Sequence, residues 1–278
     1  MHWQTRRFRL DLSRPRVMGI VNLTPDSFSD GGQFGSAAAA IAHCERLVAE
    51  GADLLDLGAE SSRPGAARID ADEEWRRLAP VLDAAVQLGV PVSVDTCKPE
   101  VMRRAIAAGA DVINDIQALQ APGAIEAVLG SEVGICLMHM KGEPDTMAKL
   151  AVYDDVVADV AAFLAQRAGV LRQAGVAADR ITLDPGYGFA KTSAQNLRLL
   201  AHQAALASLG HPLLVGWSRK RTLGEVTGRA VDGRLAASLA AALKAVQHGA
   251  HILRVHDVAA TVDALKVWQA VSDNAGPN

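Results

Sequence analysis

The sequence predicts an α/β fold, a single (β/α)8 TIM barrel with a short N-terminal hairpin, in a chain of 278 residues. Three observations support this prediction. Eight short apolar runs alternate with segments of helical pattern, each run ends in a polar residue or a glycine, and a glycine recurs between a helical segment and the next strand. An α/β barrel commonly occupies about 250 residues as one unit, so one barrel with short additions accounts for the length.

The eight apolar runs have the length and composition of buried strands. In a barrel of this kind the carboxyl ends of all strands meet on one face, and that face carries the active site. The polar residues that follow the runs are therefore candidate site residues. The runs are Val17 to Val21, Leu54 to Leu57, Val92 to Val94, Val112 to Ile113, Gly134 to Met138, Ile181 to Leu183, Leu213 to Gly216 and Ile252 to Val255.

The helical segments between the runs carry start and stop signals. Gly51, Gly109 and Gly249 each stand between a helical segment and the next strand, where glycine suits the left-handed C-cap. Acidic residues between Asp70 and Glu74 mark a helix start, because carboxylates are stabilised at the positive end of the helix dipole.

Short segments are expected outside the barrel. Apolar residues alternate between Phe8 and Leu12, which predicts a hairpin over 1–15 that closes the bottom of the barrel. The barrel is expected over 16–271, and 272–278 is expected to be a disordered tail. The connections Thr24 to Gly35 and Met140 to Val152 are longer than a barrel requires, and long connections on this face are typically functional.

Composition excludes several classes of protein. A formal net charge of −3 gives no general attraction to nucleic acid or to an anionic membrane. No apolar stretch approaches the ~18 residues that span a bilayer, and the first residues lack the apolar core of a signal peptide, so we expect no membrane partner and a cytoplasmic location. Cys44, Cys97 and Cys136 are far apart and have no metal-ligand spacing, which fits a reducing compartment.

Three segments carry groups that bind anions. Residues 22–32 supply the Asn22 amide, hydroxyls and a glycine pair, and Ser61-Ser62-Arg63 supplies two hydroxyls beside an arginine. In Arg254-Val255-His256, strand alternation places both polar side chains on one face, from which they can donate to phosphate oxygens. The Asn22 oxygen suits Mg²⁺, which takes few protein ligands beside substrate phosphates. Taken by itself, Arg254 fits an ion pair at the edge of the core as well as it fits an anion site.

Asp95, Asn114 and Asp184 form an acceptor-rich set at three strand ends. Carboxylates at the mouth of an apolar barrel must be paired or hydrogen-bonded. A ligand with several N–H donors, such as a 2-amino-4-oxo-pyrimidine ring, satisfies them, and Lys220 is placed to donate to its carbonyl or ring nitrogen. A salt bridge to Lys220 or Arg254 is the alternative for either carboxylate alone.

Three apolar residues at loop or strand ends, Phe28, Met138 and Phe189, suit the face of a flat ring, although each alone also fits a core position. The sequence has no nucleophile elbow, Walker loop, G-x-G-x-x-G opening a helix, or H-E-x-x-H. Nucleophilic hydrolysis, nucleoside triphosphate use and zinc proteolysis therefore have no support. His139 has no metal-ligand spacing and is expected to be structural or loop-positioning.

At these residues the sequence resembles the dihydropteroate synthases, a family of pterin-binding barrels. The resemblance covers Arg16 to Val271 and runs through eight blocks in order. They are NLTPDSFSDGG, SSRPGA, SVDTCKPEV, NDI, LMHMKGEPDTM, LDPGYGFAKT, GWSRK and RVHDV. The family joins 6-hydroxymethyl-7,8-dihydropterin diphosphate to p-aminobenzoate, releasing diphosphate and making 7,8-dihydropteroate for folate synthesis.

The resemblance implies roles for individual residues. Asn22 would hold Mg²⁺, and Lys220, Arg254, His256 and Asp95 would be the catalytic groups. The pterin would contact Asp95, Asn114, Ile116, Met138, Asp184, Phe189, Gly216 and Lys220; the diphosphate would contact Asn22, Ser62, Arg254 and His256; and p-aminobenzoate, with the sulfonamides that mimic it, would contact Phe28, Ser62, Arg63, Pro64 and Ser218. Ser62 stands where the family usually has Thr, which keeps the hydroxyl.

No side chain in this set is arranged as a nucleophile. Catalysis is expected to rest on positioning the arylamine and stabilising the departing diphosphate, by a dissociative, SN1-like path. The alternatives are a non-catalytic pterin-binding paralogue and a methyltetrahydrofolate-dependent methyltransferase. The resemblance also implies a homodimer. The apolar face with Leu235, Leu239, Ala242 and Leu243 serves either that dimer or the barrel, and we favour the barrel.

Overall fold

The computed structural model describes residues 1–24, 32–62 and 65–274. The barrel strands are β3 (Arg16–Asn22), β4 (Leu54–Gly58), β5 (Val92–Asp95), β6 (Val112–Asp115), β7 (Gly134–Met138), β8 (Ile181–Asp184), β9 (Leu214–Val215) and β10 (Ile252–Val255). They form one parallel sheet in the order β8-β7-β6-β5-β4-β3-β10-β9. Leu183 N donates to Pro212 O at 2.9 Å and Leu183 bridges Leu213, so β8 and β9 nearly close the barrel. The predicted fold is confirmed.

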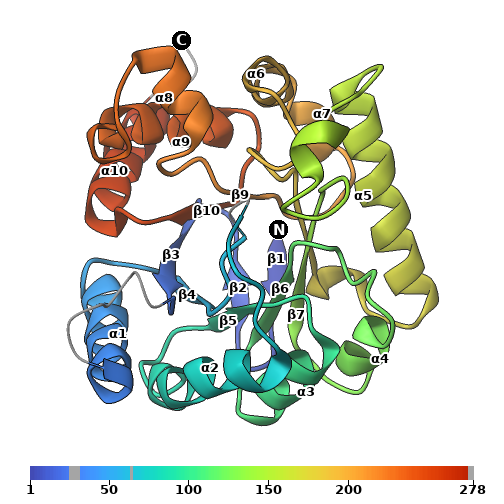
Figure 1. Cartoon of the computed structure of the whole chain (residues 1–278). Helices are drawn as coiled ribbons and strands as arrows, with labels where there is room; N and C mark the ends of the chain where they lie inside the picture. The colour runs from blue at the N-terminus through green and yellow to red at the C-terminus, as the bar shows by residue number, and fades with distance from the viewer. Residues whose placement is uncertain (25–31, 63–64, 275–278) are drawn as a thin grey trace.

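Helices surround the strands (Figure 1). Six of the eight strands are followed by a single helix, whereas β8 and β9 are each followed by two among the described residues. The helices are α1 (Gly32–Ala49), α2 (Ala71–Ala85), α3 (Pro99–Ala107), α4 (Ala124–Leu129), α5 (Val156–Gln173), α6 (Ser193–Ala201), α7 (Ala204–Ala207), α8 (Arg221–Thr227), α9 (Leu235–Gln247) and α10 (Val258–Asn274).

The expected helix signals act as predicted. The Asp70 carboxylate accepts from Glu73 N at the start of α2. Gly51, Gly109 and Gly249 have φ values of +98°, +104° and +89°, a region that glycine enters without steric cost. These caps turn the chain from the outer helices back into the barrel, so that β4, β6 and β10 begin at the bottom.

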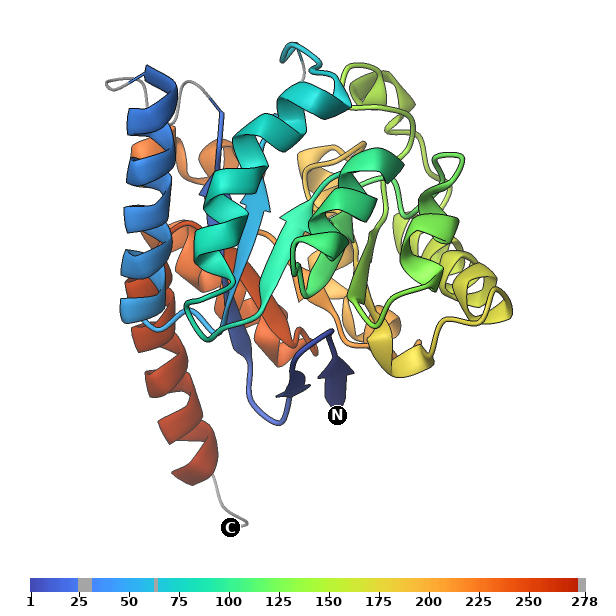
Figure 2. The ribbon, with the colours of Figure 1, turned by 90° about the horizontal axis from the view of Figure 1, so that it is seen from below.

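The N-terminal hairpin is present as β1 (His2–Gln4) paired antiparallel with β2 (Arg9–Asp11). Trp3 is fully buried beside Leu12, and its indole Nε1 donates to Arg180 O at 3.0 Å. Figure 2 shows the hairpin at the end of the barrel opposite the connection between β4 and α2. The hairpin therefore covers the barrel bottom, away from the carboxyl ends of the strands.

Three expectations about segments change. The first long connection was expected to reach Gly35, but α1 begins at Gly32. The tail was expected from Ser272, but α10 continues to Asn274. Ser272 donates to the carbonyl of Trp268 and Asn274 to that of Ala270. Residues 275–278 lie outside the described residues. On α9, Ala242 and Leu243 pack on the core of the barrel, as favoured, and only Leu235 of the apolar face departs from this, since it is 41% exposed.

None of the helices that the structure describes is both long enough and apolar enough to cross a membrane.

Candidate active site

The inside of the barrel is apolar at the bottom and polar at the carboxyl ends of the strands. Successive side chains of a strand point to opposite sides, so a residue two positions after an interior residue is also interior. The bottom layer is one buried cluster of Met18, Leu54, Val112, Cys136, Leu214 and Ile252, closed by Trp3. Two positions further along their strands come Ile20, Asp56, Asn114, Met138, Gly216 and Arg254. This second layer is the floor of the candidate site.

Arg254 is the centre of that floor. Its Nε donates to Asp56 Oδ2 at 2.6 Å and its Nη2 to Asp95 Oδ2 at 3.0 Å. Burial alone would lower the pKa of Arg254, but the two carboxylates outweigh it and raise the pKa, so the guanidinium stays charged. The ion pair that was the alternative for Asp95 is therefore present.

Asp56 is a site residue that the sequence did not reveal. It lies inside the apolar run of β4 and is fully buried. Its Oδ1 accepts from Ser93 Oγ at 2.6 Å, and Asn114 Nδ2 lies 3.4 Å from both carboxylate oxygens. The even-numbered residues of β4 point into the barrel, as Leu54 does. Asp56, two residues after Leu54, therefore also points inward, and this spacing is the signal that could have identified it.

Asp95 and Asp184 each keep an oxygen available for a ligand. Asp95 Oδ1 and Asp184 Oδ2 accept no hydrogen bond from the described residues, whereas Asp184 Oδ1 accepts from Gly186 N at 2.7 Å. Desolvation raises the pKa of both carboxyl groups. At Asp95 the charge of Arg254 opposes this rise. At Asp184 the hydrogen bond from Gly186 N opposes it most, and the charge of Lys220 opposes it less. No ion pair within 4 Å joins Asp184 to Lys220 among the described residues.

Lys220 lies beside this pair, and the ring of Phe189 covers its Nζ at 4.4 Å from the ring centroid. Burial lowers the pKa of Lys220 to about 8, against the opposing effect of Asp184. The predicted apolar residues gather on the same side, because Met138 and Ala190 form a buried cluster against which Ile116 and Phe189 pack. Gly216 lies beside Arg254, since a Cβ there would be 3.9 Å from the Arg254 Cβ.

His256 and Ser218 form a second group. Ser218 Oγ lies 3.2 Å from His256 N and 3.0 Å from His256 Nδ1, so the hydroxyl accepts from the backbone and can donate to the ring. Burial, followed by Arg219 and Arg254, lowers the pKa of His256 to about 4. The imidazole is therefore neutral near pH 7, and a neutral ring can still donate from one nitrogen.

The remaining predicted residues lie at the rim. Asn22 ends β3 opposite Gly58 of β4 and is half-buried, as is Ser62. The amide of Asn22 makes no hydrogen bond to other described residues. Phe28, Arg63 and Pro64 lie outside the described residues.

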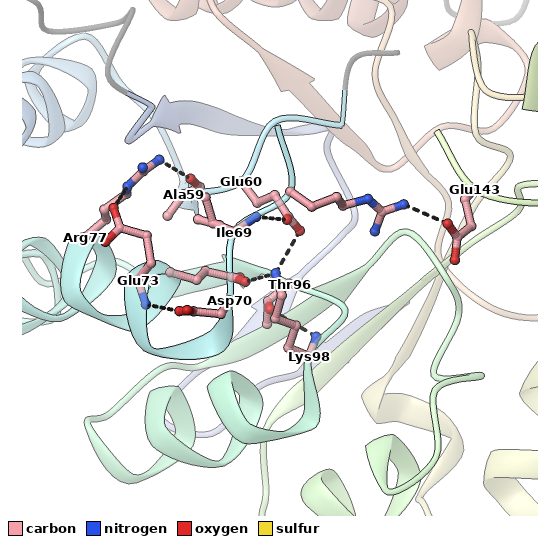
Figure 3. Close-up of polar contacts among 11 residues, drawn as sticks. Ala59, Glu60, Ile69, Asp70, Glu73, Arg77, Thr96, Lys98 and Glu143 are labelled. Carbon is pink, nitrogen blue, oxygen red and sulfur yellow. Dashed lines mark hydrogen bonds and ion pairs between the residues drawn. The ribbon is translucent and has the colours of Figure 1, made fainter. Parts of the chain in front are cut away.

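The connection from β4 to α2, which carries Ser62, is fixed at both ends. Figure 3 shows Glu60 between Ile69 and Lys98. Glu60 Oε1 accepts from Ile69 N at 3.0 Å, and Glu60 Oε2 accepts from Lys98 Nζ at 2.8 Å. Lys98 also pairs with the buried Glu74 at 2.5 Å. Local sequence carries no signal for this network, because Lys98 belongs to the β5–α3 unit and its carboxylate partners belong to the β4–α2 unit.

Two exposed contacts join the same connection to the one after β7. Arg68 pairs with Glu143 at 3.0 Å, and Gly65 N donates to Asp145 Oδ1 at 2.8 Å. Exposed pairs of this kind stabilise by about 1 kcal/mol or less. They therefore align the two connections weakly, and the Glu60 network carries most of the restraint.

Comparisons with known proteins agree with this geometry. The family described as pterin binding enzyme matches residues 18–256. A dihydropteroate synthase of Neisseria meningitidis serogroup C is 50% identical over 277 residues, covering 98% of each chain. A structure of Xanthomonas albilineans dihydropteroate synthase with 4-aminobenzoic acid has a TM-score of 0.91 at 56% identity, covering 97% of this chain and 96% of that one.

Two further solved structures show ligands. One is the Xanthomonas albilineans dihydropteroate synthase in complex with 7,8-dihydropteroate, with a TM-score of 0.88 at 54% identity and 97% coverage of both chains. The other is a Yersinia pestis dihydropteroate synthase with a sulfonamide drug complex, with a TM-score of 0.93 at 44% identity, covering 98% of this chain and all of that one.

Proposed function

This chain belongs to the dihydropteroate synthase family of pterin-binding enzymes, and we propose that it joins 6-hydroxymethyl-7,8-dihydropterin diphosphate to p-aminobenzoate by a dissociative displacement. The products are 7,8-dihydropteroate and diphosphate, in folate synthesis. The observation that carries the proposal is the pair of partly satisfied carboxylates, Asp95 and Asp184, beside Lys220 at one end of the barrel.

A pterin ring matches these groups. Its amino group and ring N–H donate, and Asp95 Oδ1, Asp184 Oδ2 and the Asn114 amide provide acceptors. Lys220 donates to a carbonyl or ring nitrogen of the same heterocycle. Met138, Ile116 and Phe189 supply apolar contact for its faces. Because buried acceptors without donors are costly, this pocket favours a ring with several N–H groups over an apolar ring.

The reacting bond is the C–O bond between the pterin methylene carbon and the diphosphate. As it breaks, its electron pair leaves with the diphosphate, and the dihydropterin ring disperses the positive charge on the methylene carbon. The amine of p-aminobenzoate then forms the C–N bond and loses a proton. No side chain is needed as a nucleophile, so the protein acts by orientation and by electrostatic stabilisation of the leaving group.

His256 and Arg254 suit the diphosphate. When Ser218 Oγ donates to Nδ1, the neutral ring of His256 carries its proton on Nε2, from which it can donate to a phosphate oxygen. Arg254 is permanently charged and lies at the floor of the same end. Both groups therefore stabilise negative charge without giving up a proton.

Mg²⁺ is the proposed metal, with Asn22 as its protein ligand. The described residues contain no group of three or more His, Cys, Asp or Glu side chains able to hold a metal ion. The uncommitted amide oxygen of Asn22 fits a metal that is held mainly by diphosphate oxygens and water. When bound, Mg²⁺ supplies positive charge to the leaving group.

The decisive experiment is a turnover assay of the purified chain with the dihydropterin diphosphate, p-aminobenzoate and Mg²⁺. We expect one diphosphate released for each dihydropteroate formed. Pterin binding without diphosphate release would indicate a non-catalytic paralogue, and methyl transfer from methyltetrahydrofolate would indicate the other alternative.

We propose that p-aminobenzoate and sulfonamides bind after the pterin and the diphosphate, in a site that includes Ser62 and Ser218. The Glu60 network supports this proposal, because it fixes only the two ends of the connection that carries Ser62. Sulfonamide affinity should therefore rise when Mg²⁺ and diphosphate are added. Equal affinity with and without them would show that the site is preformed.

We also propose a homodimer in the cytoplasm. Several large apolar side chains in the C-terminal third are exposed, which supports a covered face; they are Val226, Val231, Leu235, Val267 and Val271. Cys44, Cys97 and Cys136 are free thiols, as a reducing compartment favours. Gel filtration with light scattering at several concentrations tests the dimer.

A further inference from the structure

Lys191 is a buried lysine that the proposed reaction does not use. Only 9% of the residue is exposed. Its Nζ lies 2.9 Å from Gly186 O, 3.0 Å from Phe189 O and 3.0 Å from His139 Nδ1. His139 O lies at a longer 3.5 Å. A lysine amine has two N–H donors when neutral and three when protonated, so the three nearer acceptors can use all of its donors. An apolar side chain at this position would leave buried acceptors without a donor, which is costly.

The segment that Lys191 holds, from Gly186 to Ala190 between β8 and α6, has an unusual backbone. Gly186, Gly188 and Ala190 have φ values of +67°, +81° and +49°. An alanine in the left-handed region is strained by about 1–2 kcal/mol. A Cβ at Gly186 would lie 2.0 Å from His139 O, so the segment packs directly on the end of β7. Other contacts must therefore hold this conformation in place.

Lys191 provides most of those contacts from the inside. It connects His139, at the end of β7, with two carbonyls of the segment. His139 is itself fixed by an edge contact with Phe163 of α5, with ring centroids 4.9 Å apart. From the outside, Tyr153 Oη donates to Ala190 O at 2.9 Å.

The segment in turn forms one wall of the candidate active site. The ring of Phe189 lies over Lys220 Nζ. Gly188 touches the same lysine, since a Cβ there would be 3.1 Å from Lys220 Cδ. Ala190 packs with Met138 in the buried cluster beside Ile116. A shift of the segment would therefore move both the aromatic wall and the lysine.

We propose that Lys191 is a positioning residue for the pterin: its Nζ joins His139, Gly186 and Phe189 by hydrogen bonds and so holds the Phe189 ring against Lys220. This inference rests on the proposed function only in naming the pterin as the ligand of that wall. Burial lowers the pKa of Lys191 to about 7, against the opposing effect of Asp184, so the role of Lys191 rests on its hydrogen bonds, which both the charged and the neutral amine can donate.

The test compares Lys191→Met with the unaltered full chain. Met keeps the length and volume and removes the N–H donors. We expect the KM for the dihydropterin diphosphate to rise about tenfold, which is the effect of losing one or two hydrogen bonds. At saturating pterin, the KM for p-aminobenzoate should stay within about twofold of the value for the unaltered chain. Lys149→Met, an exposed lysine in the neighbouring connection, is the matched control and should change neither.

A double-mutant cycle identifies the route. If Lys191 acts through Phe189, Lys191→Met should raise the KM in a Phe189→Leu background by less than about threefold, because the two changes share one interaction. Full multiplication of the two effects would overturn the proposal, as would an unchanged pterin KM in Lys191→Met.

Two further measurements keep the test decisive. If Lys191→Met does not fold, Tyr153→Phe loosens the same segment by a single hydrogen bond and should raise the pterin KM by about twofold to fourfold; no change would count against the proposal. Calorimetry with a pterin lacking the diphosphate separates the two hypotheses. Absence of turnover in the unaltered chain rejects the proposed function, whereas equal pterin affinity of the unaltered chain and Lys191→Met rejects the role of Lys191.

Discussion

Asp56 has both carboxylate oxygens engaged with Ser93, Asn114 and Arg254, whereas Asp95 and Asp184 each have an oxygen with no partner among the described residues. The difference separates two roles for the same side chain. Asp56 holds the guanidinium of Arg254 in place, and the other two carboxylates remain able to accept from a ligand. At the scale of single residues, unused hydrogen-bonding capacity therefore identifies the binding groups better than residue type does.

Asp184→Ala should weaken pterin binding by about 1–3 kcal/mol, or roughly fivefold to 150-fold, because the N–H donors of the ring lose their acceptor in a desolvated site. Asp184→Asn keeps the shape of the side chain and should also bind the pterin weakly, since the NH2 group of the amide would face the N–H donors of the ring. Calorimetry with a pterin that lacks the diphosphate measures the effect. Unchanged affinity in both variants would place the pterin elsewhere.

The His256 pKa, lowered to about 4 by burial and by the neighbouring Arg219 and Arg254, should rise when diphosphate and Mg²⁺ bind, because added negative charge favours the imidazolium. The ring should then take up a proton over a pH range between 4 and 6.5 in which the free chain stays neutral. NMR titration of the ring, assigned with His256→Asn, measures this shift. A titration midpoint that is the same with and without the ligand contradicts the placement of the diphosphate.

At the scale of elements, the site depends on connections that are fixed by side chains from other units. The β4–α2 connection is held by Lys98 from the start of α3, through Glu60, and by Arg77 of α2, whose Nη1 lies 3.3 Å from Ala59 O. The segment after β8 is held by Lys191 and His139. In both cases a buried or half-buried lysine joins the carboxyl ends of two strands, which makes the walls of the site rigid relative to each other.

Glu60→Gln should raise the KM for p-aminobenzoate several-fold and leave the KM for the dihydropterin diphosphate nearly unchanged, because the amide cannot replace the ionic contact with Lys98. Glu45→Gln, on the exposed face of α1, is the control for loss of one carboxylate. Steady-state kinetics with each substrate varied in turn give the two KM values. A parallel rise in both would mean that the network supports the whole barrel mouth.

At the scale of the whole molecule, the two ends of the barrel differ in their contribution to stability and to the site. The bottom is closed by Trp3 and the hairpin over a layer of apolar side chains, and Arg7 pairs there with the buried Asp111 at 2.7 Å. The top carries charged groups whose pKa values are shifted by burial, which is a destabilising arrangement that the apolar layer below must offset. Stability and activity should therefore be separable by mutation.

Trp3→Ala should lower the free energy of unfolding by about 3–5 kcal/mol, since it leaves a cavity below the barrel and removes the hydrogen bond to Arg180 O. Trp3→Phe should cost less. Denaturant unfolding measures the stability, and kcat well below the unfolding transition should stay within about twofold of the unaltered chain. A large fall in kcat of the folded variant would show that the two ends are coupled.

Much of this architecture follows from local sequence. The strand–helix alternation, the glycine C-caps, the acidic start of α2 and the polar residues at strand ends depend on backbone conformation and on periodicity within about ten residues, and each is where it was predicted. Because the carboxyl ends of parallel strands must meet, the sequence also predicted that Asp95, Asn114, Asp184, Lys220 and Arg254 share one face.

Only the closed barrel decides which of these groups touch. Arg254 and Asp56 are 198 residues apart and meet because β10 pairs with β3 and β3 with β4. The sequence alone did not identify Asp56, because a strand buried on both faces has no alternation of polar and apolar residues that would mark its interior side. The neutral state of His256 and the three-acceptor site of Lys191 depend on burial by segments distant in the chain. Desolvation and long-range pairing are properties of the packed molecule, and local sequence carries no signal for them.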